Sequence, residues 1–239
     1  MFDARKLLEE FLGSTAGTSG GGQGGGGPDD LLRRGQEYLR SNSGSLARGA
    51  LAGGLAGLLL GTKGGRKLGK SALTYGGMAL VAGLAYKAYR DYRGEGATPA
   101  PVLPPPDESP FSPTNQPGGE QDFALVLLTA MIAAAKADGH IDADEQRRIF
   151  DKLDTLALDS EAKAFVMDEL RAPLDIERVV RGARSPEAAL EIYAASRLAI
   201  DPDHPAERAY LQMLAARLGL EPGLAEEVDR AVAEVNGAS

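Results

Sequence analysis

The sequence contains no cysteine, and only two of its 239 residues are histidine. The absence of cysteine excludes disulfide bonds, thiolate nucleophiles and cysteine-based zinc sites, and it is compatible with a reducing compartment. The chain also has neither a G-x-S-x-G nucleophile motif nor a P-loop, because the glycines at 20–27 are not followed by Lys-Ser or Lys-Thr. These absences argue against an enzyme, and we expect a non-catalytic protein.

Long hydrophobic runs are missing too, although a glycine ladder indicates a membrane-associated segment. The apolar stretches 46–60 and 72–86 are each about fifteen residues long, whereas a comfortable transmembrane helix needs about 20. Within residues 46–86 glycine recurs at every fourth position from residue 49 to residue 69, a spacing that lets a second helix approach closely, as membrane helices do. The ladder consists of Gly49, Gly53, Gly57, Gly61, Gly65 and Gly69. We expect a glycine-zipper helical hairpin within residues 29–95 that inserts shallowly into a membrane or lies on it.

Charge is divided unevenly along a chain whose formal net charge is −8. Residues 31–93 are strongly basic, and the C-terminal half is acidic. A folded nucleic-acid-binding domain would normally carry the positive face itself, so we expect no nucleic-acid partner. The basic segment suits anionic membrane lipid instead, and we expect lipid contact through residues 46–93. The tyrosines that would anchor this segment at the interface are Tyr86, Tyr89 and Tyr92.

Composition divides the chain into five parts. Residues 1–13 predict a short amphipathic helix and lack the continuous apolar stretch of a signal peptide. Residues 14–28 (STAGTSGGGQGGGGP) are expected to be a disordered glycine-rich tether. Residues 96–120 are rich in proline, and we expect an extended linker that separates the membrane-associated segment 29–95 from a globular domain at 121–239.

The C-terminal domain has helical periodicity throughout and no strand signal, so the sequence predicts an all-α fold. Its first helix is apolar around most of its circumference and should be the central helix of a bundle. Several of the helices are expected to begin with a proline at the first helical position, in one case directly after a serine. The predicted helices are 121–137, 142–156, 160–171, 175–183, 186–200, 205–218 and 222–236.

Two acidic turns in this domain carry the candidate site. The first, residues 138–145 (DGHIDADE), matches the second half of an EF-hand loop. Its first half fails, because Ala134 and Lys136 stand where carboxylates should be, so a standard calcium hand is not expected. The second turn, residues 199–207 (AIDPDHPAE), has the same length and similarly placed acids. If the helices that they open are neighbours, the two turns form one cluster for a divalent cation, with His140 or His204 as additional ligands. The predicted metal ligands are Asp138, Asp142, Glu145, Asp201, Asp203 and Glu207.

The same residues also fit a purely structural role. Gly139 can end the first helix in a left-handed conformation, and Asp142 with Glu145 can form a capping box for the next helix. Both turns would then be helix caps on a solvated acidic surface. The sequence leaves the two interpretations open.

The residues resemble a known family. The run from Lys136 to Glu145 (KADGHIDADE) after an apolar helix, with further helices and a second acidic turn, resembles the TerB-like tellurite-resistance domain. The glycine-rich segment ending at 86–92 (YKAYRDY), followed by a proline-rich linker, is similar to the YebE-type uncharacterised bacterial inner membrane proteins. The acids of the first turn match the family motif well, whereas Pro202 and Pro205 alter the second turn.

This resemblance implies a bundle of about seven helices, pseudo-symmetric about the two acidic turns. It implies attachment to the bacterial inner membrane with the C-terminal domain in the cytoplasm. It also implies binding of a metal ion and an association with envelope stress or metal resistance, but it supplies no reaction.

Three functional hypotheses follow from these patterns. The leading one is a membrane-anchored, non-enzymatic interaction protein with a TerB-like domain that binds a divalent cation, with self-association and an unidentified protein partner. The alternative is a soluble oligomeric scaffold whose glycine-zipper hairpin self-associates without lipid. The third is a metal-dependent hydrolase that activates water at the two acidic turns.

Overall fold

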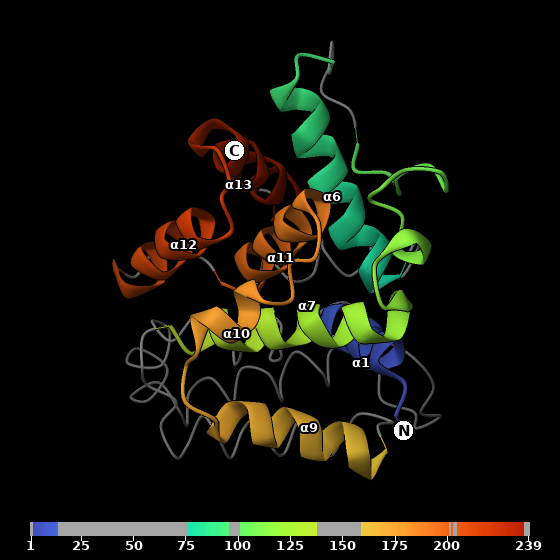
Figure 1. The fold of residues 1–239 in the computed structure, drawn as a ribbon, viewed down its shortest axis with the longest axis vertical. Coiled ribbons are helices and arrows are strands. Elements are labelled where there is room, and N and C mark those ends of the chain that lie inside the picture. Colours follow the sequence, from blue (N-terminus) through green and yellow to red (C-terminus); the bar gives the residue numbers. More distant parts are fainter. Residues whose placement is uncertain are drawn as a thin grey trace, which may run out of the picture.

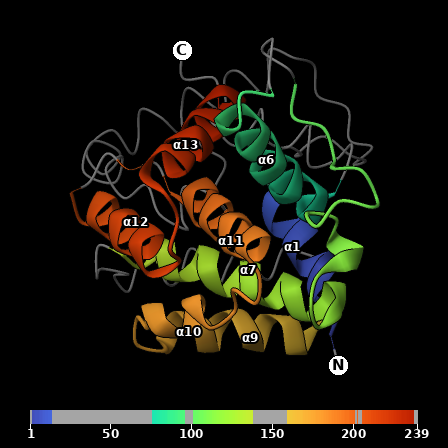
Figure 2. The ribbon, with the colours of Figure 1, turned by 45° about the horizontal axis from the view of Figure 1, so that its top comes forward.

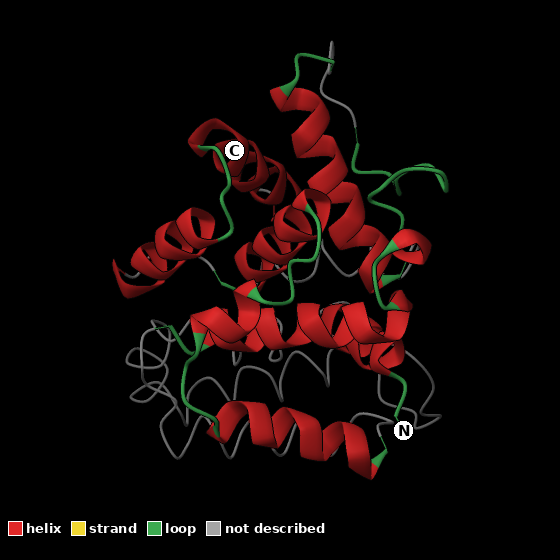
Figure 3. Ribbon diagram, viewed as in Figure 1, coloured by secondary structure: helices red, strands yellow, loops and turns green. Residues whose placement is uncertain are grey.

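The computed structural model describes residues 2–13, 76–95, 101–137, 159–200, 202 and 205–236. Every regular element within these ranges is a helix, so the predicted all-α fold is confirmed for them (Figure 3). In chain order the elements are α1 (Ala4–Gly13), α6 (Gly77–Tyr92), the 3-10 turn η1 (Pro113–Asn115), α7 (Gly119–Ala135), α9 (Ser160–Arg171), α10 (Ile176–Val180), α11 (Pro186–Ala199), α12 (Pro205–Arg217) and α13 (Pro222–Asn236). The glycine ladder, the tether at 14–28 and the predicted helix 142–156 lie outside the described residues.

The helix starts follow local chemistry that the sequence displays. Asp159 and Ser185 cap α9 and α11, and their side-chain oxygens accept a backbone N–H three residues later at 2.8 and 3.0 Å. Pro186, Pro205 and Pro222 occupy the first helical positions of α11, α12 and α13. Proline suits that position because its φ is already helical and its missing N–H would have no partner there. These starts were predicted from the sequence and are confirmed.

Helix α7 is the centre of the bundle, as its apolar sequence predicted. It contacts α1, α9, α10, α11 and α12. In Figure 1, α7 runs across the middle of the molecule with α9 on one side and α6, α11 and α13 on the other, and Figure 2 shows the same order from a second direction. Its largest fully buried side chains are Leu127, Leu128, Met131 and Ile132.

The predicted N-terminal amphipathic helix forms as α1 and packs against α6 and α7. Gln121 at the start of α7 fixes its first turn, because Gln121 Oε1 accepts from the Ala4 N–H and Gln121 Nε2 donates to Asp3 Oδ1, both at 2.8 Å. An ion pair joins Arg5 to Glu120 beside these bonds. Leu7, Leu8 and Leu12 are buried on the inner face. Helix α1 is therefore part of the core.

The packing of helix α6 differs from what the sequence predicted for residues 29–95. Helix α6 is the helix of this segment that the structure describes. The sequence predicted a membrane-associated segment held apart from the helical domain. In the structure α6 packs against α13, α11 and α1, and Leu80, Val81 and Leu84 are at most 2% exposed. The apolar side chains of α6 are thus covered by helices of the same chain. No helix among the described residues is long and apolar enough to span a bilayer.

Two glycines of α6 explain how its neighbours come so close. A Cβ at Gly77 would lie 3.0 Å from the Leu8 carbonyl oxygen of α1, and a Cβ at Gly83 would lie 2.5 Å from the Leu103 carbonyl oxygen. Glycine removes the side chain that would block these backbone approaches. The small residues of α6 therefore serve packing inside the protein.

The proline-rich residues 101–118 also differ from the predicted extended spacer. They run along α6, and Phe111 is buried with its ring 5.8 Å from Tyr86 and 5.5 Å from Tyr89 between ring centroids. The third predicted membrane anchor, Tyr92, donates its hydroxyl to Glu221 at the start of α13. All three tyrosines thus make contacts within the protein, because the segment from 101 to 118 and α13 cover the end of α6.

Candidate functional site

The structure places one of the six predicted metal ligands. Glu207 lies in the first turn of α12, and its residue is 5% exposed. The other five, Asp138, Asp142, Glu145, Asp201 and Asp203, lie outside the described residues, as do His140 and His204. Within the described ranges no three acidic or histidine side chains gather in a way that could hold a metal ion. The predicted cation site therefore stays a prediction.

The helix before the first acidic turn and the helix after the second are neighbours. Helix α7 ends at Ala135, three residues before the first turn, and α12, which begins at Pro205, packs against α7. The Ser196 hydroxyl near the end of α11 donates to the Ala130 carbonyl of α7 at 3.5 Å. The two helices that flank the second turn, α11 and α12, thus both pack against the helix that precedes the first turn.

Lys136 fixes the end of α7 just before the first acidic turn. Its Nζ donates to the carbonyl oxygens of Glu169, at 2.8 Å, and Ala172, at the end of α9. Burial lowers the pKa of Lys136 and outweighs the opposing effect of Glu169, whose own carboxylate pairs with Arg178. A lysine placed on the last carbonyls of a helix satisfies acceptors that the helix leaves open. Its role here is structural.

A second polar cluster joins α11 to α13. Arg197 Nε lies 3.4 Å from Asp229 Oδ1, which also accepts from the Tyr193 hydroxyl at 3.2 Å. Arg197 Nη1 donates to the Ile200 carbonyl oxygen at 2.8 Å. Burial raises the pKa of Asp229, although the Arg197 guanidinium opposes this shift. Since each of these groups has a partner inside the protein, the cluster serves as a cross-link between helices.

A pocket of about 530 Å³ lies at the N-terminal end of α11. Its volume is within the range that is usual for small-molecule sites, roughly 300–1,000 Å³. Apolar side chains from four parts of the chain line it, among them Phe111, Leu190, Leu220 and Leu224. Its charged lining residues are Arg184, Glu187, Arg217 and Glu221.

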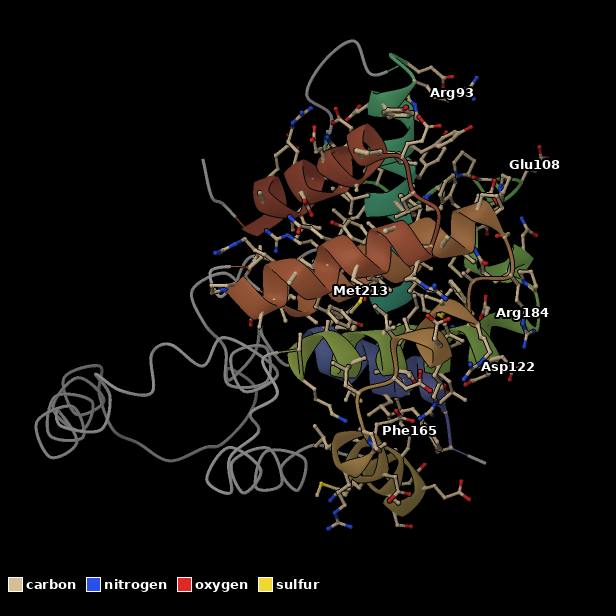
Figure 4. The ribbon with its side chains drawn as sticks, turned by 60° about the vertical axis from the view of Figure 1, so that its left-hand side comes forward. Arg93, Glu108, Asp122, Phe165, Arg184 and Met213 are labelled. Atoms are coloured by element: carbon tan, nitrogen blue, oxygen red, sulfur yellow. The ribbon has the colours of Figure 1, made fainter. Side chains whose placement is uncertain are left out.

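Most of the charged groups at this pocket already have partners. Arg217 Nη2 lies 2.6 Å from Glu177 Oε2, and Glu221 accepts from Tyr92. Arg184, at the right-hand edge of the molecule in Figure 4, donates weakly to the Pro117 carbonyl oxygen at 3.4 Å. Two positive and two negative side chains give the rim no net charge. The pocket can take an apolar group, but its electrostatics do not select the sign of a ligand.

A buried carboxyl group lies deeper in α11. Glu191 is 0% exposed, and its Oε1 accepts from Gln116 Nε2 at 2.6 Å. Burial raises the pKa of Glu191 well above its usual value, and the negative charge of Glu187 raises it further. Sequence reasoning missed this group and the pocket. The signal was present, because Glu191 interrupts the apolar run of α11 between Leu190 and Ile192.

Comparison with known proteins places the chain in a family. A family described as "Protein of unknown function (DUF533)" matches residues 45–232. The chain belongs to the DUF533 family. A relative from Yersinia enterocolitica, described as "Uncharacterized protein in ampR 5'region", is 30% identical over 108 residues, which cover 45% of this chain and 78% of the relative. No solved structure matches the chain.

The span of the DUF533 match bears on how the chain is divided. It begins at residue 45, before the glycine ladder, and ends at 232 within α13. It therefore includes α6 together with the C-terminal helices. A family unit of this extent agrees with the packing of α6 against α11 and α13.

Proposed function

We propose that this DUF533 protein is a membrane-attached, non-enzymatic interaction protein whose TerB-like helical domain binds a divalent cation at its two acidic turns. The ligands would be Asp138, Asp142, Glu145, Asp201, Asp203 and Glu207. By its resemblance to TerB-like and YebE-type proteins, we place it at the bacterial inner membrane with the helical domain in the cytoplasm and associate it with envelope stress or metal resistance.

The packing of α12 against α7 is the observation that supports the cation site most directly. It brings the helix that follows the second turn beside the helix that precedes the first. Glu207, in the first turn of α12, is buried rather than solvated. Hard cations such as Ca²⁺, Mg²⁺ or Mn²⁺ prefer carboxylate and other oxygen ligands, which the two turns would supply.

A non-enzymatic role is supported by the chemistry of the described polar groups. The buried or half-buried charges of Lys136, Glu169, Arg197 and Asp229 all join one helix to another. The pocket beside α11 is lined mainly by apolar groups, a composition typical of recognition. An unidentified protein partner is part of the proposal.

Metal titration of the intact chain tests the cation site. The C-terminal part alone is unsuitable, because α1 and α6 supply part of the core. We expect heat on addition of at least one of Ca²⁺, Mg²⁺, Mn²⁺ and Zn²⁺, and a stabilisation of about 2.7 kcal/mol at a hundredfold excess over Kd. Asp142→Asn and Glu207→Gln should each weaken binding, whereas Glu226→Gln on the exposed side of α13 should not. The absence of heat and of thermal stabilisation with all four ions would refute the site.

Residues 46–75 are the part of the chain that we propose to contact the membrane. Since α6 is packed inside the protein, lipid contact is left to the apolar run and basic residues that precede it. These basic residues are Arg48, Lys63, Arg66, Lys67 and Lys70. Cations and amphipathic helices are drawn to anionic lipid surfaces.

Deletion of residues 46–75 separates the membrane hypothesis from the scaffold hypothesis. The variant keeps α1, α6 and the 32 residues at 14–45 that join them. We expect the wild type to sediment with vesicles containing anionic lipid and the deletion variant to remain in the supernatant. The wild type could instead stay in the supernatant as a defined oligomer while the deletion variant is monomeric. The scaffold hypothesis would then replace the membrane hypothesis.

A further inference from the structure

Two buried side chains share one hydrogen bond and leave two acceptors open. Gln116 Nε2 donates to Glu191 Oε1 at 2.6 Å and also to the Pro110 carbonyl oxygen at 3.3 Å. Glu191 Oε2 and Gln116 Oε1 are buried and have no hydrogen-bond partner within the described residues. Gln116 is 4% exposed and Glu191 is 0% exposed.

A proton on the Glu191 carboxyl removes the mismatch between the two open acceptors. A carboxylate offers only acceptors, so an ionised Glu191 would be a buried charge beside a second open acceptor, which is costly. A protonated carboxyl has one O–H donor, and a carboxylic acid and a primary amide then have complementary donors and acceptors. The environment therefore favours the neutral acid form of Glu191 over the ionised form.

Among the described residues, the helices around Glu191 offer its carboxyl no compensating cation. Glu191 lies on α11, which packs against α6, α7, α12 and α13. Glu187, one turn earlier on α11, contributes a negative charge that disfavours ionisation further. The charged groups of the packed helices with partners of their own are Lys87, Asp91 and Arg93 on α6, Glu120 on α7, Arg217 on α12, and Asp229 and Glu234 on α13. Arg197 on α11 itself is bound to Asp229. The other charged groups on these helices and on residues 101–118 do not contribute to the shift in the pKa of Glu191, and they are Arg90, Asp107, Glu108, Asp122, Glu207, Arg208, Glu226, Glu227 and Arg230.

We propose that the Glu191–Gln116 pair is a proton-operated latch that holds residues 101–118 against α6 and α11 and releases them when Glu191 ionises. An ionised carboxylate needs water, and water reaches Glu191 once the segment that carries Gln116 moves away. Phe111, which forms part of the pocket wall, lies on the same segment next to Pro110. Release of the latch therefore also opens the pocket beside α11.

The direction of the pH effect follows from the raised pKa of Glu191. The stabilising contribution is complete below the pKa of an unfolded glutamate, about 4.3, and is lost as pH rises to the folded pKa. Between these limits the open form has lost a proton that the closed form keeps. The opening equilibrium of the segment should then increase about tenfold per pH unit, and it should level off above the folded pKa.

Hydrogen exchange of the full chain between about pH 5 and 9 tests the latch. After correction for intrinsic exchange, we expect the protection of residues 101–118 to fall about tenfold per pH unit in the wild type, while α9 serves as an internal reference. Glu191→Gln should make the protection of this segment independent of pH. Glu187→Gln keeps the pair but removes the neighbouring charge, so its fall in protection should level off at a lower pH.

Two further measurements test the latch. Gln116→Leu removes the amide but leaves the acid, and we expect low protection of residues 101–118 at every pH. Infrared spectra recorded as the pH is raised should show a protonated carboxyl band in the wild type that persists to a higher pH than an ordinary glutamate allows and that Glu191→Gln abolishes. A pH-independent wild-type profile, a pH-dependent Glu191→Gln profile or the absence of that band would each overturn the proposal.

Discussion

Leu84 of α6 offers the sharpest test of whether this helix belongs to the protein core. The side chain is 0% exposed and belongs to a cluster that also contains buried residues of α1, α7, α11 and α13. If α6 were part of a membrane-associated segment held apart from the helical domain, shortening Leu84 would leave the stability of that domain unchanged. In the observed packing, Leu84→Ala opens a cavity in the shared core.

The expected cost follows from the atoms that are removed. Leu84→Ala deletes three carbon atoms, and each buried carbon contributes about 0.8 kcal/mol, which gives about 2.4 kcal/mol of lost transfer free energy. The cavity adds to this value, because neighbouring helices relax only in part. We therefore expect a loss of about 3–4 kcal/mol in the free energy of unfolding. For a domain with a total stability of about 5–15 kcal/mol, this is a large fraction.

Urea unfolding of the full chain, followed by circular dichroism, measures this loss. Leu84→Met preserves the volume and should cost less than about 1.5 kcal/mol. Leu103→Ala truncates a side chain that is 52% exposed and should change stability by about 0.5 kcal/mol or less. A Leu84→Ala effect no larger than that of Leu103→Ala would refute the placement of α6 in the core.

Three further substitutions test other contacts by the same unfolding measurement. Gly83→Ala brings a Cβ to 2.5 Å from the Leu103 carbonyl oxygen, so we expect a loss of about 1–2 kcal/mol, although better helix propensity alone would stabilise the chain. A gain in stability would show that residues 101–118 do not lie against α6. Asp159→Ala removes the cap of α9 and should cost about 1 kcal/mol, whereas Asp159→Asn should cost much less. Lys136→Met removes two hydrogen bonds to the last carbonyls of α9 and should cost about 1–2 kcal/mol, and an unchanged midpoint would contradict its structural role.

The helices of the C-terminal half were readable from the sequence because their signals are local. A cap such as Asp159, a proline at the first helical position and apolar periodicity act within one or two turns. The predicted ranges 160–171, 186–200 and 222–236 agree with α9, α11 and α13 to within one residue. The apolar circumference of α7 likewise predicted its central place.

The role of α6 was not readable in the same way. An apolar helix with small residues suits both a membrane and a protein core, since both exclude water and both favour close backbone approach. Sequence alone could not choose between them, because the choice depends on whether α1, α11 and α13 cover the helix. The proline-rich segment was misjudged for the same reason, as its packing rests on Phe111 and Gln116 meeting partners far along the chain.

For the candidate sites, the two acidic turns were visible as sequence motifs, and the structure adds the buried position of Glu207. The position of Glu191 within an apolar run was visible, but its pairing with Gln116 was out of reach, because 75 residues separate the two. The pocket was out of reach because distant parts of the chain form its wall.

The sequence by itself determined that the described chain is helical and where most of its helices begin and end. Only the tertiary structure decided that α1, α6 and residues 101–118 join the C-terminal helices in one core. The physical reason is the distance along the sequence over which each kind of interaction acts. Caps and periodicity act between neighbours in the chain, whereas burial depends on which surfaces meet. For example, the backbone carbonyls of Leu8 and Leu103 lie close to two glycines of α6, although they are far from these glycines or outside α6 in the sequence.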